Sequence, residues 1–455
     1  MPHTPIHRVL IASACLLWTT GIASAQPAVD YTRLTARSAP AWLHDGFIYE
    51  LNVRTFSPTG NFAGVTARLP ELKQLGVSVV WLMPIHPLGQ VKKKGSIGSP
   101  YAVRDYYGIN PAYGTADDLK RLVAEAHRVG LKVIIDVVAN HTSWDNVMMK
   151  VPSYYKRDAS GQVRSPYDWT DVAALDYGNP ALRQYMTDML VHWIRDFDLD
   201  GFRCDVAGEV PTDFWVAARA ATERVKPGLF FLAEADHPDL LAEAFDMDYG
   251  WAMYHAMSGS IVEGRPATVV REAWEQEQRR YPRGALHLRI ADDHDERRAV
   301  TRFGERGALP ATVLVFTLDG VPVVYNGQEV GDATESRDPA LFEQMPVFWN
   351  ARRIRPWIAQ DFGEIVALRK AHPALRTGEL EWVGNSDADR ILTFIRRDAT
   401  EEVLVTVNLT NRPFAGTVQV SGAWTEVTPE VGGRPGALPA LSLEAWGVRV
   451  FARGR

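Results

Sequence analysis

The stretch Asp198-Leu-Asp-Gly-Phe-Arg-Cys-Asp-Val-Ala207 places an arginine and an aspartate two residues apart in a short run that predicts a strand. Side chains alternate along a β-strand, so Arg203 and Asp205 are expected on one face and Cys204 on the other. Taken alone, the pair fits a structural ion pair at a strand end as well as it fits a functional site. The rest of the chain decides between the two.

Two further acids stand at the ends of apolar runs. Glu234 directly follows the run 229–233, and Asp295, preceded by His294, follows the run 286–291. The carboxyl ends of parallel strands meet at one edge of a sheet, so acids that follow such strands come together. Three acids at three strand ends therefore predict one shared site.

From residue 47 onward the chain alternates short apolar runs with amphipathic stretches, as βα units around a parallel sheet do. The expected strands are 47–53, 77–83, 133–138, 201–206, 229–233, 245–249, 286–291 and 321–325. Thr115-Ala-Asp-Asp118 resembles a capping box, and Asn179-Pro180 is typical of a helix start. Eight strands with intervening helices predict a (β/α)₈ TIM barrel, whose chemistry lies at the carboxyl ends of its strands.

Two segments depart from a plain barrel. Residues 141–178 lack strong periodicity and are rich in turn residues and aromatics, which predicts a short loop domain inserted after the third strand. Its aromatic side chains either stack on a ligand or pack the loop on itself. The last segment, 377–455, alternates like an antiparallel β-sandwich, with strands expected near 391–396, 403–408, 417–420 and 447–451. The barrel then comprises 26–140 and 179–376.

Composition and the first residues set the cellular context. The 455 residues are 46% hydrophobic and 23% charged, and the net charge of −6 comes without basic runs, so no nucleic-acid partner is expected. Residues 1–25 predict a signal peptide: Arg8 precedes the apolar run 9–18, which is too short to span a bilayer, and Ala23-Ser-Ala25 offers a cleavage site. The expected location is the bacterial periplasm or the medium, without a membrane anchor after cleavage.

The order and spacing of the strand-end motifs carry a resemblance. The motifs are Asp136-Val-Val-Ala-Asn-His141, Gly201-Phe-Arg-Cys-Asp205, Glu234 and His294-Asp295, followed by Gly320-Val-Pro-Val-Val-Tyr-Asn-Gly-Gln-Glu329. Together they resemble the α-amylase family, glycoside hydrolase family 13, over about residues 45–455. The resemblance implies a glycosidase that uses a covalent intermediate. Such retaining enzymes need two carboxyl groups about 5–5.5 Å apart, one to attack the sugar carbon and one to protonate the leaving oxygen.

The resemblance also implies roles for individual acids. Asp205 would be the nucleophile, Glu234 the general acid and then base, and Asp295 a ligand of sugar hydroxyls that favours the distorted ring. Arg203, grouped with the substrate-binding residues, would keep Asp205 ionised and oriented, since a nearby cation favours the charged form. Asp136 would support the site from beneath.

The same resemblance implies further contacts with the sugar at the cleavage position. His141 and His294 would hydrogen-bond its hydroxyl groups. Tyr101 would stack on its ring, with Tyr106 and Tyr107 as alternatives.

Metal ligands of the family are incomplete in this chain. Many relatives bind calcium through an asparagine equivalent to Asn140, a loop-domain aspartate and a ligand after the nucleophile strand. Here Ala174 occupies the position of the loop-domain aspartate. Gly208 lies after the nucleophile strand, in the region where relatives carry a histidine. Calcium prefers six to eight oxygen ligands, so we expect no required metal or other cofactor.

The resemblance leaves the substrate open. The favoured expectation is an α-amylase-like enzyme that hydrolyses α-1,4 bonds in starch-derived malto-oligosaccharides. The alternatives are a cyclomaltodextrinase or neopullulanase, an exo-α-glucosidase and an α-glucan transglycosylase. The short stretch between Ala25 and the first strand leaves no room for the extra N-terminal domain of some cyclodextrin-degrading relatives, which weighs against that alternative. A catalytically inactive sugar-binding barrel is disfavoured because all three acids are present. Oligomeric state is not predicted.

Overall fold

The computed structural model describes residues 29–335, 337–428, 434–435 and 437–455. The expected signal peptide, 1–25, lies outside these residues. Among the described residues no helix is both long enough and apolar enough to cross a membrane.

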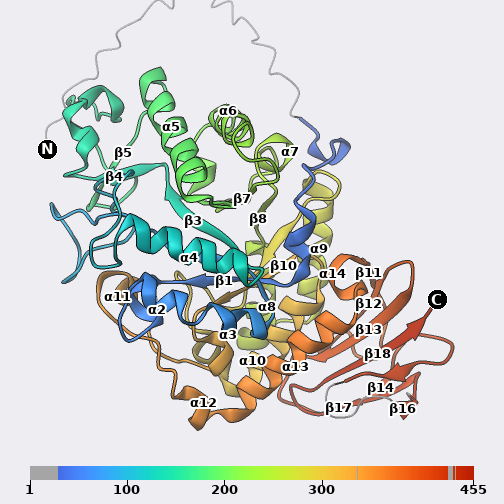
Figure 1. Cartoon of the computed structure of the whole chain (residues 1–455). Helices are drawn as coiled ribbons and strands as arrows, with labels where there is room; N and C mark the ends of the chain where they lie inside the picture. The colour runs from blue at the N-terminus through green and yellow to red at the C-terminus, as the bar shows by residue number, and fades with distance from the viewer. Residues whose placement is uncertain (1–28, 336, 429–433, 436) are drawn as a thin grey trace, which may run out of the picture. The chain divides into compact units, whose positions relative to one another are not determined.

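Eight parallel strands close into a barrel in the order β1-β10-β9-β8-β7-β6-β3-β2 (Figure 1). They are β1 (Phe47–Leu51), β2 (Val77–Leu82), β3 (Lys132–Val138), β6 (Gly201–Asp205), β7 (Phe230–Ala233), β8 (Met247–Tyr249), β9 (His287–Arg289) and β10 (Val321–Tyr325). Nearly all their residues are buried, because helices cover the outer face and side chains fill the inner one. The predicted TIM barrel is confirmed, and the ends of its strands agree with the expected ranges to within two residues.

Helices connect the strands and surround the barrel. The α-helices are α1 (Val53–Phe56), α2 (Phe62–Thr66), α3 (Leu69–Leu75), α4 (Ala116–Arg128), α5 (Pro180–Phe197), α6 (Thr212–Glu223), α7 (Leu240–Glu243), α8 (Trp251–Glu263), α9 (Thr268–Arg280), α10 (Ala299–Thr317), α11 (Asp338–Phe342), α12 (Ala351–Ile354), α13 (Pro356–Ala371) and α14 (Ala374–Thr377). Single 3₁₀ turns are η1 (Tyr31–Arg33), η2 (Ala41–Asp45), η3 (Val147–Lys150), η4 (Pro152–Tyr154), η5 (Ala207–Glu209) and η6 (Gln328–Val330).

The sequence signals for helix starts act as expected. In the capping box of α4, Asp118 N donates to Thr115 Oγ1 (3.2 Å) and Thr115 N donates to Asp118 Oδ2 (2.8 Å). At the start of α5, Ala181 N donates to Asn179 Oδ1 at 2.9 Å, and Pro180 occupies the first turn, where a helix needs no amide donor. Both helices therefore begin where their caps predict.

Between β3 and α5 the chain makes an excursion over the carboxyl end of the barrel. Within it β4 (His141–Ser143) pairs antiparallel with β5 (Val172–Ala174). The Tyr106 hydroxyl, which carries one proton, lies 2.6 Å from the Val138 carbonyl and 2.7 Å from that of His141, and so ties the start of the excursion to the barrel.

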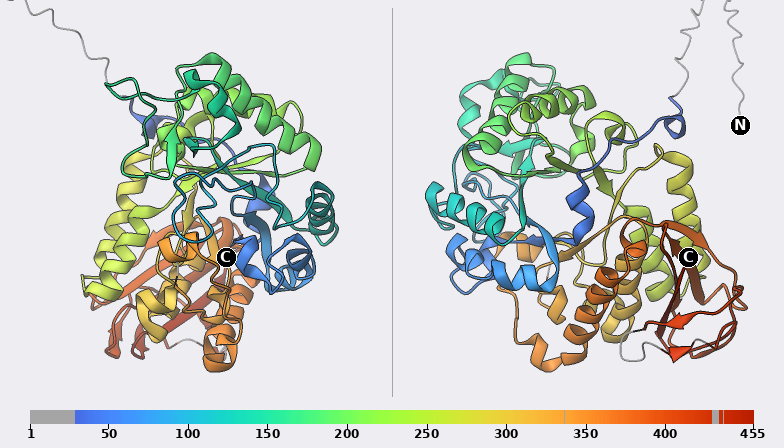
Figure 2. Two further views of the ribbon diagram at one scale, coloured as in Figure 1. Left: turned by 90° about the vertical axis from the view of Figure 1, so that its left-hand side faces the viewer. Right: turned by 45° about the vertical axis from the view of Figure 1, so that its right-hand side comes forward.

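The C-terminal part forms two antiparallel sheets. The larger one has the order β11-β12-β13-β18-β15-β16 and the smaller one pairs β14 with β17. The strands are β11 (Glu379–Trp382), β12 (Ile391–Arg397), β13 (Glu401–Asn408), β14 (Phe414–Thr417), β15 (Thr425–Glu426), β16 (Arg434–Pro435), β17 (Ala440–Leu443) and β18 (Val448–Gly454). Apolar side chains from both sheets share one core. The predicted antiparallel architecture is confirmed, and Figure 2 shows these sheets beside the C-terminal helices of the barrel.

One C-terminal strand is misplaced by the sequence pattern. The sequence pattern predicts a strand over residues 417–420. In the structure β14 runs from Phe414 to Thr417, so the observed strand ends at the residue where the expected one begins. Phe414 is buried and pairs with Leu443 of β17, and this contact sets the register. Beyond Thr417 only an isolated bridge, between Val418 and Asn385, continues the pairing.

Candidate active site

The carboxylates predicted from the sequence meet above the carboxyl ends of the barrel strands. Asp205 ends β6, and Glu234 follows β7, whose Ala233 pairs with Cys204. Both acids line a cavity of about 230 Å³. Its other lining residues are Lys94, Ser99, Tyr101, His141, Trp169, Asp171, Val172, Val206, Asp295, Leu341 and Phe342.

Arg203 lies beneath these acids and is fully buried. Its Nη1 lies 2.9 Å from Asp136 Oδ1 and 3.0 Å from Asp205 Oδ1, and its Nη2 lies 2.8 Å from Glu234 Oε2. The last contact is an ion pair rather than an aligned hydrogen bond. One guanidinium thus holds three carboxylates together. Because Arg203 is enclosed in this way, its position favours the orienting role expected of it over direct contact with a sugar.

The surroundings of Asp205 strongly perturb its ionisation. Burial raises its pKa well above the ordinary value, the charge of Glu234 raises it further, and Arg203 opposes both. The expectation that Arg203 keeps Asp205 ionised therefore describes one of several opposing effects. Ionisation of Asp205 depends on the arginine remaining in place.

The backbone after Asp205 is strained. Val206 has φ 45° and ψ 43°, a left-handed conformation that β-branched residues rarely adopt. Such a conformation costs about 1–3 kcal/mol and persists only where its surroundings impose it. Here it directs the Val206 amide onto Glu234 Oε2 at 2.8 Å, so the strained residue positions the second carboxylate.

Asp136 supports the site from below. It is fully buried and accepts hydrogen bonds from Tyr101 O–H (3.1 Å) and Trp81 Nε1 (3.3 Å) besides its contact with Arg203. Burial raises its pKa to about 6, although Arg203 acts in the opposite direction. The position agrees with the supporting place expected for it.

Asp295 belongs to a chain of polar contacts on the other side of the cavity. His294 Nε2 lies 3.2 Å from Asp295 Oδ2 and 2.7 Å from the Tyr101 hydroxyl, while its Nδ1 contacts Glu50. Burial alone would lower the pKa of His294, but Asp295 and Glu50 raise it well above its ordinary value. Burial alone would raise the pKa of Asp295, but His294 lowers it. The pair is therefore an imidazolium beside a carboxylate, and Asp295 faces the cavity as an anion.

The tyrosine alternatives are separated by position. Tyr101 lines the cavity and stacks on His294, with ring centroids 5.2 Å apart. Tyr106 is buried in the core, and Tyr107 packs outside against Tyr185. Only Tyr101 of the three lines this cavity.

His141 lines the cavity as well. Its Nε2 lies 3.9 Å from Asp205 Oδ2, and its ring packs edge-on against Trp169 at 5.5 Å. Burial lowers its pKa to about 4, so the ring is neutral near pH 7 and can both donate and accept a hydrogen bond. Trp169 shows that one aromatic of the inserted segment does line the cavity.

Several residues of the site were not predicted. Lys94 Nζ lies 3.1 Å from Asp171 Oδ1, so an ion pair joins the β2–α4 loop to the inserted segment at the cavity rim. Leu341 and Phe342, at the end of α11, also line the cavity. Glu50 could have been found, because it is a lone acid within the apolar run of β1. The rim residues have no such signal.

The residues present do not fit a calcium site. Asn140 Nδ2 faces His141 Nδ1 at 3.4 Å, and Ala174 on β5 brings no oxygen ligand in its side chain. Beside Gly208 stands the ring of His237, which an added Cβ would meet at 3.0 Å. Among the described residues no three or more His, Cys, Asp or Glu side chains cluster as metal ligands would.

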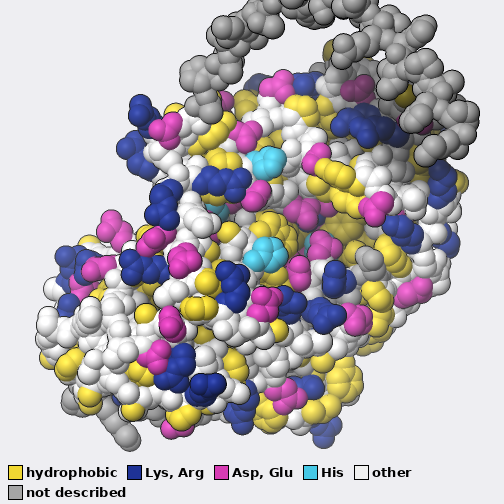
Figure 3. Space-filling model, turned by 180° about the vertical axis from the view of Figure 1, so that it is seen from behind, with side chains coloured by type: hydrophobic (Ala, Val, Ile, Leu, Met, Phe, Trp, Pro, Cys, Tyr) yellow, Lys and Arg dark blue, Asp and Glu magenta, His cyan; other side chains and the backbone are white. Residues whose placement is uncertain are grey.

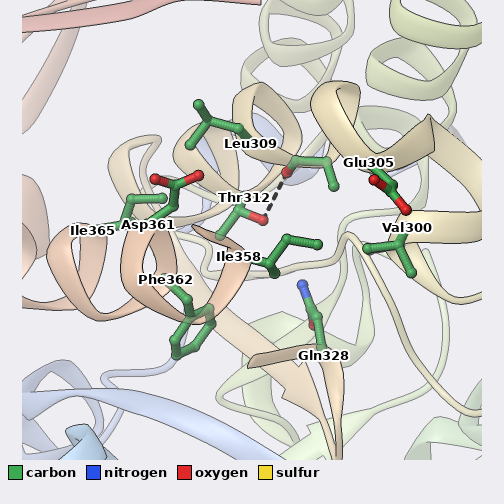
Figure 4. Close-up of a pocket in the computed structure, with 11 residues that line it drawn as sticks. Val300, Glu305, Leu309, Thr312, Gln328, Ile358, Asp361, Phe362 and Ile365 are labelled. Atoms are coloured by element: carbon green, nitrogen blue, oxygen red, sulfur yellow. Dashed lines mark hydrogen bonds between the residues drawn. The ribbon is translucent and has the colours of Figure 1, made fainter. Parts of the chain in front are cut away.

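A separate, small cavity lies between α10 and α13 (Figure 4). Its volume is about 20 Å³, room for little more than one water molecule. The only hydrogen bond drawn there, from Thr312 Oγ1 to the Ala308 carbonyl (2.8 Å), is internal to α10. Its lining is largely apolar, and we assign it no function.

The surface carries charges of both signs. The face shown in Figure 3 has acidic and basic side chains interspersed with hydrophobic ones, without a large patch of one sign. Such a surface gives no electrostatic preference for a polyanion.

Comparisons with known proteins agree with this geometry. The family model "Alpha amylase, catalytic domain" matches residues 35–169 and 166–371. A solved α-amylase of Lactobacillus plantarum is 32% identical, with a TM-score of 0.81 over 90% of this chain and 99% of that one. A noncanonic maltogenic α-amylase, AmyB of Thermotoga neapolitana, is 30% identical, with a TM-score of 0.80 over 91% and 97%.

Among curated proteins, a cyclomaltodextrinase of Geobacillus thermopakistaniensis is 28% identical over 387 residues, or 77% of this chain. The chain spans 57% and 62% of the length of two of the curated relatives it matches.

Proposed function

The chain belongs to the α-amylase family, glycoside hydrolase family 13, and we propose that it is an α-glucan hydrolase that cleaves α-1,4 bonds in short or cyclic maltodextrins. The favoured expectation, an α-amylase-like enzyme acting on starch-derived malto-oligosaccharides, gives way here to its cyclomaltodextrinase or neopullulanase alternative. A cyclomaltodextrinase and a maltogenic amylase among the similar proteins support this choice.

The observation that carries the proposal is the pairing of Asp205 and Glu234 on one guanidinium at the floor of the cavity. A shared cation keeps two carboxyl groups close to one another, as a retaining glycosidase requires. Glycosidic cleavage also needs one acid near the sugar carbon and another near the leaving oxygen. Neighbouring strands β6 and β7 supply these two positions.

The chemistry follows in two steps. Asp205 attacks the anomeric carbon while the bond to the leaving oxygen breaks and Glu234 gives that oxygen its proton. The sugar is then held by an ester to Asp205. Glu234 takes a proton from water, the resulting hydroxide attacks the same carbon, and the ester bond breaks to free Asp205. Asp295 binds hydroxyl groups of the sugar throughout.

The rim of the cavity favours short or cyclic substrates. The Lys94–Asp171 ion pair joins two loops there, and Phe342 stands beside them on α11. A bridged rim limits how much of a long polymer can pass. A cyclic or short oligosaccharide needs less open space.

A product profile tests the substrate class. Initial rates on β-cyclodextrin, maltoheptaose, soluble starch, pullulan and trehalose are compared at equal glucose content. We expect β-cyclodextrin and maltoheptaose to be cleaved faster than starch, with maltose or glucose as main products. Faster cleavage of starch, with long oligosaccharides as intermediates, would contradict this proposal and favour an α-amylase. Transfer of glucosyl units to acceptor sugars would instead identify a transglycosylase.

Replacing the nucleophile tests the mechanism. We expect Asp205→Asn to lower kcat by roughly 10⁴-fold or more while maltoheptaose still binds, because only the attacking carboxylate is lost. Hydrolysis rates and calorimetric binding measure the two effects. Asp168→Asn, an exposed acid outside the cavity, serves as the matched control. Turnover close to wild type in Asp205→Asn would refute the assignment.

A further inference from the structure

A further cavity, lined by apolar and charged side chains, lies at the amino-terminal ends of β1 and β2, the end of the barrel away from Asp205 and Glu234. Its volume is about 110 Å³, several times the space that one water molecule needs. Its charged lining residues are four cations and one acid: Lys73, Arg369, Lys370, Arg376 and Asp45. The lining is therefore strongly cationic.

Arg369, on α13, is the buried member of this set, with 3% of its surface exposed. Its Nη1 donates to the carbonyls of Phe316 (2.7 Å) and Leu375 (2.8 Å), and its Nη2 donates to that of Gly320 (3.2 Å). Its Nε has no hydrogen-bond partner among the described residues. Carbonyl groups at the end of α10 offset only part of a full positive charge.

A second buried guanidinium adds to this charge. Arg396 donates to the Thr317 carbonyl (2.7 Å) and shares the Leu375 carbonyl with Arg369 (3.1 Å). Asp319 is the acid whose charge acts on Arg396, but its carboxylate is already paired with Arg289 at 3.1 Å. Two cations thus converge on one carbonyl.

Asp45 is the only acid among the described residues that line this cavity, and it is exposed. The Nε of Arg376 is buried without a partner among the described residues, and Lys73 Nζ donates to the Gly130 carbonyl at 2.7 Å. Burial, together with Arg396 and Arg376, lowers the pKa of Arg369 to about 9, the direction expected of a cation that lacks an anion. Uncompensated buried charge is costly, so the cluster favours binding of an anion from solution.

We propose that this cavity binds a small tetrahedral oxyanion, inorganic phosphate or sulfate, between Arg369, Arg376 and Lys370. Guanidinium and ammonium groups bind such oxyanions through charged N–H donors, and Arg369, Arg376 and Lys370 all line the cavity. The anion neutralises the cluster and stabilises the amino-terminal end of the barrel. The proposal does not depend on the proposed activity, because the cavity lies away from the catalytic acids.

Thermal unfolding of the full chain tests the site. Inorganic phosphate is titrated at neutral pH while sodium chloride keeps the ionic strength constant, and sulfate is titrated in parallel. We expect a saturable rise of Tm with phosphate, with sulfate or with both, and none with chloride. A response to both assigns the site to oxyanions as a class, and a response to one identifies which it prefers.

Three variants and a control make the test specific. Arg376→Gln and Lys370→Gln should each weaken the apparent affinity for phosphate roughly tenfold, by loss of one charged donor. Asp45→Asn should tighten it, because the acid at the cavity repels an anion. Arg353→Gln, an exposed arginine of α12 outside the cavity, should match wild type.

If Arg376→Gln does not fold, the phosphate titrations of Lys370→Gln and Asp45→Asn decide the test, because both of these residues are exposed. A Tm rise that sodium chloride reproduces, or one that neither of these two variants alters, would overturn the proposal.

Discussion

Arg203 decides the chemistry of the site at the scale of single residues. Its guanidinium contacts Asp136, Asp205 and Glu234, so three carboxylates that would repel each other stay together, and two of them, Asp205 and Glu234, line the cavity. The strained Val206 then aims Glu234 through its amide. Removal of either residue would change where a carboxylate points, whereas the strand register would keep the backbone in place.

A buried histidine outside the site gives a prediction on pH and stability. His86 is fully buried, and burial lowers its pKa from 6.5 to about 4. Below pH 6.5 the His86 side chain becomes protonated in the unfolded chain, whereas in the folded chain it stays neutral down to about pH 4. Its contribution to stability is thus complete above pH 6.5 and falls by about 3 kcal/mol as the pH drops to 4.

We therefore expect the stability of wild type to decline more steeply from pH 6.5 to 4 than that of His86→Gln. Denaturant unfolding at a series of pH values measures the difference. His255→Gln, on the surface of α8, is the control and should follow wild type. Parallel curves for wild type and His86→Gln would show that the histidine is protonated in the folded chain.

At the scale of elements, loops surround the cavity into which the barrel strands direct their acids. The β2–α4 loop, the inserted segment and α11 meet at the rim, where Lys94 pairs with Asp171 beside Phe342. The barrel supplies fixed carboxylates, and these loops set how much substrate reaches them. Substrate choice is therefore a property of the loops.

The rim ion pair predicts a change in substrate preference. Lys94→Ala should raise the ratio of starch to β-cyclodextrin hydrolysis about threefold to tenfold, because the two loops lose their link. Its effect on the free energy of unfolding should stay below about 1 kcal/mol, since Lys94 is partly exposed. Lys93→Ala, on the same loop but outside the cavity, is the matched control. An unchanged ratio would mean that the rim does not limit the substrate.

At the scale of the whole molecule, the barrel and the C-terminal sheets pack as one unit over residues 31–455. α10 and α14 contact β12 and β13, so the last helices of the barrel lie against the larger C-terminal sheet. The catalytic acids and the cationic cavity lie at opposite ends of the same barrel. Function and stability can thus be tested separately.

Calcium dependence is a prediction at this scale. The family's usual calcium ligand set is incomplete in this chain, so we predict that dialysis against a chelator leaves both activity and Tm unchanged. Elemental analysis before and after dialysis provides the check. Calcium retained in stoichiometric amount, with activity lost when it is finally stripped, would contradict the prediction.

Export is a second prediction at this scale. Residues 1–25 have the pattern of a signal peptide, so we expect the mature chain to begin at Gln26 and to occur in the periplasm or medium. Intact-mass measurement of fractionated cells tests both points, with a variant lacking residues 2–25 as control. An unprocessed chain in the cytoplasm would contradict it.

The sequence by itself determined the barrel, the place of its strands and the acids Asp205, Glu234 and Asp295 at strand ends, because periodicity and spacing are local properties of a chain. Only the tertiary structure decided that Arg203 is enclosed by three carboxylates, that Glu50 contacts His294 across 244 residues, and that Lys94 bridges the rim. These contacts depend on burial and on the approach of distant segments, which no local pattern records. The cationic cavity at the other end of the barrel arises in the same way.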